Sequence, residues 1–161
     1  MGKAMSLSSR IAAIAVGLVV VWALLSSGGQ ELPEVAGSLE EALPANGRPC
    51  LLVFFSTDCE VCFDDLLEMN YFVDQKGLAV RVIGISGDTA ADLEKFAGKH
   101  SLKCRLVRDD RGRIRRRFRV DDVPFKIVLE EGTERYRDDV YQGFEERRRR
   151  AEECLLAIGG Q

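Results

Sequence analysis

The body of the chain alternates between short apolar runs and segments with helical periodicity. The clearest run is Leu51-Leu-Val-Phe-Phe55, which is continuous and therefore typical of a strand buried on both faces of a sheet. Further strands are predicted at residues 78–85, 104–107 and 125–129. Glu131-Gly132 indicates a hairpin turn, so the more charged residues 133–141 are expected to pair with the preceding strand.

Between these runs, apolar residues recur with the spacing of one helix face. Such a stripe extends from Cys62 to Val73 and predicts a helix that ends at Lys76-Gly77. Thr89 and Asp92 have the spacing of a capping box at the start of a second helix. Shorter patterns predict helices at residues 114–118 and 144–158.

Strands and helices are therefore expected in the order β-α-β-α-β-α-β-β-α. This alternation is typical of an α/β fold in which helices flank both faces of one sheet. The closing hairpin adds antiparallel strands, so the predicted sheet is mixed.

The first thirty residues have a different character. Lys3 and Arg10 precede an uncharged, largely apolar segment that continues to Gln30. Within it, residues 9–27 approach the roughly 20 residues that a membrane-spanning helix needs. We interpret residues 1–30 as a signal anchor in the cell membrane. The alternative is a signal peptide cleaved near Gly28, although no A-x-A cleavage site is present.

The charges that flank this segment predict its orientation. Basic residues precede it and Glu31 and Glu34 follow it, which places the N-terminus in the cytoplasm and the rest of the chain in the periplasm or its equivalent. Residues 31–46, broken by Pro33 and Pro44, are expected to form a linker with a short helical patch at residues 38–43. Residues 47–158 then form a single folded domain.

Charge and composition exclude some functions. The 161-residue chain has a formal charge of −3. Because the first thirty residues carry only Lys3 and Arg10, the rest of the chain is more negative than this value. A mildly acidic domain gives no reason to expect nucleic acid as a partner. The hydrophobic fraction of 46% is ordinary for a globular protein.

The chemically informative motif is Cys59-Glu-Val-Cys62, which follows a buried strand and opens a helix. A helix N-terminus carries unpaired N–H groups and a partial positive charge, and both favour the reactive thiolate. We expect Cys59, at the end of the turn, to be the attacking thiol. Cys62 lies one turn inside the helix and is expected to resolve the mixed disulfide. Asp58 is expected to cap the helix.

A structural disulfide and half of a zinc site are the alternatives for this pair. Zinc would require two more ligands nearby, whereas the chain has one histidine, His100. The other cysteines, Cys50, Cys104 and Cys154, are single and are predicted to be thiols of the core. We therefore expect neither a metal nor another cofactor.

Residues 54–62, Phe-Phe-Ser-Thr-Asp-Cys-Glu-Val-Cys, together with Val123-Pro124 before a strand, resemble the extracytoplasmic thioredoxin-like oxidoreductases of the ResA/TlpA type. The resemblance covers about residues 45–158. It implies a thioredoxin-like fold and a thiol–disulfide oxidoreductase. The expected partners are exported protein thiols or disulfides, such as apocytochrome c, together with a membrane electron donor. Val61, where the family usually has proline, is a departure that bears on the partner and the redox potential.

The resemblance also implies roles for three further residues. Pro124 is expected to be cis and to face Cys59, and Val123 to offer its backbone to an extended substrate. Thioredoxins carry a buried acid at the position of Val53, and the family alternative lies three residues after the second cysteine, where this chain has Asp65. Asp65 is therefore expected to take the proton of Cys62, the alternative being an exposed helix residue.

Two functions of other classes remain open on this fold. A peroxiredoxin-like peroxidase would require a Pro-x-x-x-Thr-x-x-Cys frame, in which this chain has Leu52 and Ser56. A copper chaperone would use a wider cysteine spacing and a histidine beyond the proline region, and no histidine follows His100. A thiol–disulfide oxidoreductase, acting as a reductant, remains the principal prediction.

Overall fold

The computed structural model describes residues 35–45 and 47–160. The strands are β1 (Val35–Ala36), β2 (Cys50–Phe55), β3 (Arg81–Ser86), β4 (Arg105–Arg108), β5 (Phe125–Glu130) and β6 (Thr133–Arg137). The helices are α2 (Leu39–Ala42), α3 (Glu60–Gln75), α4 (Ala90–His100), the 3-10 turn η1 (Asp110–Gly112), α5 (Arg113–Phe118) and α6 (Phe144–Gly159).

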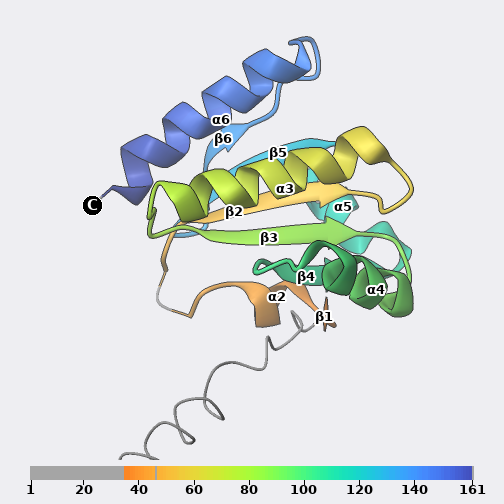
Figure 1. Ribbon diagram of the computed structural model, residues 1–161. Coiled ribbons are helices and arrows are strands. Elements are labelled where there is room, and N and C mark those ends of the chain that lie inside the picture. The colour runs from red at the N-terminus through yellow and green to blue at the C-terminus, as the bar shows by residue number, and fades with distance from the viewer. Residues whose placement is uncertain (1–34, 46, 161) are drawn as a thin grey trace, which may run out of the picture. The chain divides into compact units, whose positions relative to one another are not determined.

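The strands form one six-stranded sheet in the order β1-β4-β3-β2-β5-β6 (Figure 1). The pairs β1–β4, β4–β3 and β3–β2 are parallel, whereas β5 is antiparallel to both β2 and β6. The predicted mixed sheet with flanking helices is therefore confirmed.

Helices cover both faces of this sheet. One core layer joins it to α3, α4 and α6, and a second joins it to α2 and α5. The connections from β2 to β3 and from β3 to β4 advance in one direction, so right-handed crossovers place α3 and α4 on one face. Successive side chains of β2 enter opposite layers, Val53 the first and Phe54 the second. This explains the unbroken apolar run.

The structure departs from the predicted elements in three places. Residues 78–80 do not belong to β3, because the Ala79 N–H donates to the carbonyl of Gly159 at the end of α6 (3.0 Å). Strand β6 ends at Arg137, after which Asp138 turns inward and is buried. Within residues 31–46, the expected linker, α2 agrees with the predicted helical patch, whereas β1 pairs with β4 and Leu39 is buried in the second core layer.

The predicted anchor at residues 1–30 lies outside the described residues. In the part of the chain that the structure describes, no helix combines the length and the apolar character needed to cross a bilayer.

Candidate active site

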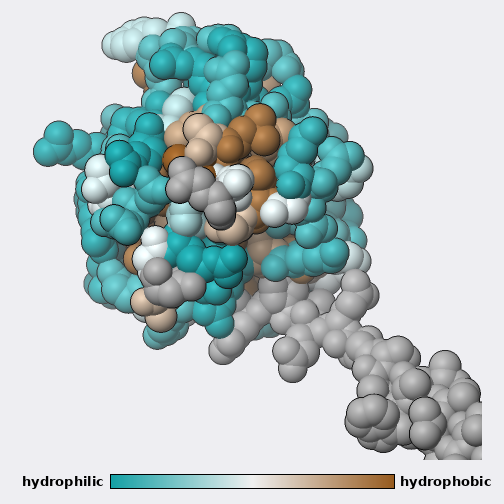
Figure 2. All heavy atoms as spheres, turned by 90° about the vertical axis from the view of Figure 1, so that its left-hand side faces the viewer, coloured by the Kyte–Doolittle hydropathy of each residue, from teal (hydrophilic) through white to brown (hydrophobic). Residues whose placement is uncertain are grey.

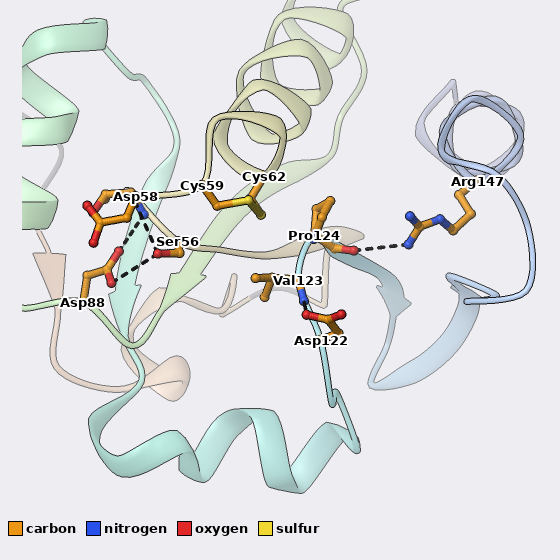
Figure 3. Close-up of a disulfide and its surroundings, with 10 residues drawn as sticks. Ser56, Asp58, Cys59, Cys62, Asp88, Asp122, Val123, Pro124 and Arg147 are labelled. Atoms are coloured by element: carbon orange, nitrogen blue, oxygen red, sulfur yellow. Dashed lines mark hydrogen bonds between the residues drawn. A yellow bond between two sulfur atoms is a disulfide. The ribbon is translucent and has the colours of Figure 1, made fainter.

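Cys59 and Cys62 form a disulfide at the N-terminus of α3, with an S–S distance of 2.07 Å and a Cα–Cα distance of 5.2 Å (Figure 3). Cys59 is the N-cap residue, with extended backbone, and is partly exposed. Cys62 lies in the first turn and is completely buried. Both cysteines thus occupy the positions predicted from the sequence, Cys59 partly exposed at the start of the helix and Cys62 buried in the core.

The turn before Cys59 is held by a residue from another loop. Asp88, which follows β3, accepts hydrogen bonds from the Thr57 N–H (2.6 Å) and the Ser56 hydroxyl (3.5 Å). The prediction that Asp58 caps the helix is wrong, because the chain enters α3 through Cys59, whose side chain makes no capping hydrogen bond. Cys59 therefore lies at the positive end of the helix dipole, which favours negative charge on its sulfur.

The Val123–Pro124 peptide bond is cis, as the resemblance implied. Figure 3 shows this dipeptide beside the disulfide, on the chain that leads into β5. The Val123 N–H donates to Oδ1 of Asp122 (2.8 Å), and the Pro124 carbonyl accepts a hydrogen bond from Nη1 of Arg147 on α6 (3.2 Å). Val123 and Cys59 pack against the same core layer, so the dipeptide borders the site.

Asp65 lies one helical turn beyond Cys62 and is fully buried, which rules out the alternative of an exposed helix residue. Its Oδ2 is 2.7 Å from Nζ of Lys126 on β5, and neither side chain reaches solvent. Burial raises the pKa of Asp65, and the charge of Asp138 adds to this, whereas Lys126 and Arg147 oppose it. The desolvation of the carboxylate thus outweighs the attraction of Lys126, and the net shift of the Asp65 pKa is upward.

Sequence reasoning missed the charged residues that surround Asp65. Lys126 Nζ also lies 3.2 Å from Oδ2 of Asp138, whose side chain is completely buried. Asp138 in turn accepts hydrogen bonds from the Lys126 N–H (3.0 Å) and the Tyr136 hydroxyl (2.6 Å). A lysine within the apolar strand Phe125–Glu130 was the available signal, because buried lysines are rare unless they are paired.

The remaining cysteines are free. Burial raises the pKa of the Cys50 thiol to about 11 and that of Cys104 to about 12, so both remain protonated at neutral pH. The prediction that all three are core thiols is confirmed for these two. Cys154 on α6 is only partly buried, although burial raises its pKa too.

The other end of the sheet carries a separate cleft of about 720 Å³, where α3 ends and β3 and β4 begin. Figure 2 shows this end of the molecule, with an apolar area framed by hydrophilic side chains. The cleft is lined by apolar residues, among them Val73, Leu78 and Val80, and by the basic residues Arg81 and Lys103. Among the described residues, no three His, Cys, Asp or Glu side chains are grouped as metal ligands would be.

A model of the AhpC/TSA family matches residues 32–138 of this chain. No curated protein matches the chain in a sequence comparison.

Solved structures share the fold. A secreted disulfide oxidoreductase of Mycobacterium tuberculosis, homologous to E. coli DsbE, aligns over 81% of this chain and 100% of its own, with a TM-score of 0.57 and 17% identity. A thioredoxin-like protein of Porphyromonas gingivalis aligns over 81% and 94%, with a TM-score of 0.59 and 21% identity. Peroxiredoxin Q of Xanthomonas campestris aligns over 70% and 80%, with a TM-score of 0.58 and 15% identity. At these identities the likeness establishes a thioredoxin-like fold, as predicted, and no more.

Proposed function

The chain belongs to the AhpC/TSA family, and we propose that within it this protein is a thiol–disulfide oxidoreductase that acts through Cys59 and Cys62. The observation that carries the proposal is the disulfide itself. It closes the first turn of a helix and joins Cys59, which is partly exposed, to Cys62, which is completely buried. A disulfide that only stabilises the fold does not require one partly exposed and one buried cysteine.

The reduced protein would act in two steps. The Cys59 thiolate attacks one sulfur of a partner disulfide, and the other partner sulfur leaves as a thiolate. Cys62 then loses its proton and attacks the Cys59 sulfur. The Cys59–Cys62 bond forms and the partner leaves as its second thiolate, so two electrons have passed to the partner. The oxidised protein can run the same steps in reverse.

Asp65 is our candidate for the proton acceptor in the second step. It shares the buried side of α3 with Cys62, and residues three apart on a helix are neighbours. A carboxyl group whose pKa is raised by burial is a better base at neutral pH than an ordinary carboxylate. Its Oδ1 has no hydrogen-bond partner among the described residues, which leaves one oxygen free to accept a proton.

Val123 and Pro124 are our candidates for the substrate-binding residues. Proline has no N–H, so Pro124 presents no donor toward the disulfide, while the backbone of Val123 can pair with an extended segment of a partner. We further propose that the domain works outside the cytoplasm, anchored by residues 1–30. There it would reduce disulfides of exported proteins such as apocytochrome c, with electrons supplied by a membrane electron donor.

Trapping of partners tests this proposal. A Cys62→Ser variant cannot resolve the mixed disulfide, so partners should accumulate on Cys59 as adducts that dithiothreitol releases. The double variant Cys59→Ser/Cys62→Ser should capture none. Adducts that form equally well on the double variant would contradict the assignment of Cys59.

A peroxidase is the second candidate, because peroxiredoxin Q of Xanthomonas campestris shares this fold. Consumption of hydrogen peroxide by the reduced protein distinguishes the two. We expect rapid reduction of protein disulfides and slow reaction with peroxide, since Leu52 and Ser56 stand where the peroxidatic frame has proline and threonine. The opposite ratio of rates would favour the peroxidase.

A further inference from the structure

Lys126 is the buried charge nearest to Asp65. It stands opposite Val53 of β2 in the sheet and shares its face with Val128, in the layer that also holds α3 and α6. Its side chain is completely buried. The ammonium group has a carboxylate on each side, Asp65 at 2.7 Å and Asp138 at 3.2 Å.

Two features keep this ammonium group in place. The Phe144 ring of α6 lies 5.4 Å from Lys126 Nζ, a distance typical of cation–π contact. Asp138 is itself held by the Lys126 N–H and the Tyr136 hydroxyl, and Nη1 of Arg147 lies 3.6 Å from its Oδ2. A buried ammonium group that has lost its water is stable only with such partners.

We infer that Lys126 is a positioning residue for the resolving step: its ammonium group holds Asp65 in place and favours its carboxylate form, while Asp138 holds Lys126. The inference rests on the proposed function and extends it. Because Lys126 binds Oδ2, Oδ1 of Asp65 is the oxygen left to receive the proton of Cys62. Lys126 therefore governs both the orientation of the base and the pH range in which it is ionised.

Removal of single charges around Asp65 should shift its pKa, in a direction that depends on the sign of the charge removed. On the side of β5 and β6 it faces Lys126 and Asp138, and on the side of α6 it faces Arg147 and Glu152. Removing the Lys126 charge should raise the pKa of Asp65 further, because the largest opposing attraction disappears. Neutralising Asp138 should lower it, because one like charge is lost and Lys126 then has a single carboxylate partner.

The experiment measures resolution on the full-length protein, in mild detergent, with Cys154→Ser as background. The Cys59 thiolate of the reduced protein attacks the aromatic disulfide dithiobis(nitrobenzoate), so that a mixed disulfide forms on Cys59 and one thionitrobenzoate leaves. The Cys62 thiolate attacks the Cys59 sulfur, the Cys59–Cys62 bond forms, and thionitrobenzoate leaves as a coloured thiolate. The rate is recorded against pH, and the Asp65 carboxyl carbon is titrated by NMR in the same variants.

Lys126→Met should raise the pH midpoint of both curves by about one unit or more, which means about tenfold slower resolution below the midpoint. Asp138→Asn should move both midpoints down. Lys95→Met, on the exposed face of α4, is the matched control and should move neither. A general structural defect would not shift the midpoints of Lys126→Met and Asp138→Asn in opposite directions. If Lys126→Met does not fold, the midpoints of Asp138→Asn alone test the inference.

Midpoints that stay fixed in a protein with normal exchange would overturn the role of Lys126 and leave the proposed function standing. Absence of exchange in the parent protein would overturn the proposed function, and this inference with it.

Discussion

Nη1 of Arg147 donates a hydrogen bond of 3.2 Å to the carbonyl oxygen of Pro124 (Figure 3). The bond joins α6 to the chain that borders the disulfide, across 23 residues of sequence. Arg147 is largely buried and also lies near Asp138, so its guanidinium group links the cis-proline segment to the buried charges beneath the site.

Replacement of Arg147 by leucine should weaken the binding of protein substrates. The Pro124 carbonyl would lose its donor, and the backbone of Val123 would be less firmly positioned to pair with a partner. A hydrogen bond from a charged donor is worth about 1 kcal/mol or more, so we expect KM to rise about fivefold with a smaller change in kcat. Steady-state reduction of a protein disulfide measures both. Arg149→Leu is the control, because Arg149 pairs on the exposed face of α6 with Glu146 and Glu153. Equal effects of the two variants would contradict this coupling.

The three free cysteines should be dispensable for exchange. Cys59→Ser should abolish the reduction of insulin, because the buried Cys62 cannot reach a partner. Cys50→Ser, Cys104→Ser and Cys154→Ser should each retain activity, measured by insulin turbidity after confirming the fold by circular dichroism. Full activity in Cys59→Ser would rule out Cys59 as the attacking thiol.

Asp65→Asn should slow the resolving step and leave the first step unchanged, since an amide cannot accept the proton of Cys62. General bases contribute about 10²-fold or more, so a loss of that order is expected at neutral pH. Stopped-flow kinetics of the two steps from acid to alkaline pH provide the measurement. Asp64→Asn, on the exposed side of the same helix, is the control. Identical profiles for both variants and the parent would remove Asp65 from the mechanism.

The stability of the oxidised protein should depend on Asp65 in a defined direction. Its pKa in the folded state is raised above the ordinary value of 3.8 by burial, with Lys126 opposing. The folded state therefore binds this proton more tightly than the unfolded chain does. The resulting stabilisation is complete below the ordinary pKa and is lost as the pH rises through the raised one.

Denaturant unfolding at a series of pH values measures this effect. Relative to Asp65→Asn, the parent protein should lose free energy of unfolding as the pH rises from about 4, by about 1.4 kcal/mol for each pH unit by which the pKa is raised. Asp64→Asn should follow the parent. Parallel curves for the parent and Asp65→Asn would contradict the raised pKa.

The N-terminal segment should hold the domain outside the cytoplasm. Alkaline phosphatase fused after Gln161 should be active and should remain with the membrane fraction, because basic residues such as Lys3 and Arg10 before an apolar segment favour a cytoplasmic N-terminus. A cytoplasmic reporter at the same position should be inactive. Activity of the cytoplasmic reporter would refute this orientation, and release of the fusion into the periplasm would indicate cleavage instead of anchoring.

Features that depend on neighbours along the chain could be predicted from the amino-acid sequence. A strand, a turn and a helix follow one another from Cys50 to Gln75, so the apolar run and the helical stripe suffice to place Cys59 at the helix start and Cys62 one turn inside. The burial of Asp65 could also be predicted, because Asp65 occupies the same side of the helix as Cys62.

The groups that meet around Asp65 could not be predicted in this way, because they come from distant parts of the chain. Lys126 is 61 residues away from it, and Asp138 a further 12. Their meeting depends on β5 pairing with β2 beneath α3, and on the turn after β6 directing Asp138 inward. Local spacing carries no information about such contacts, because they are selected by the requirement that each charge removed from water find a partner of opposite sign.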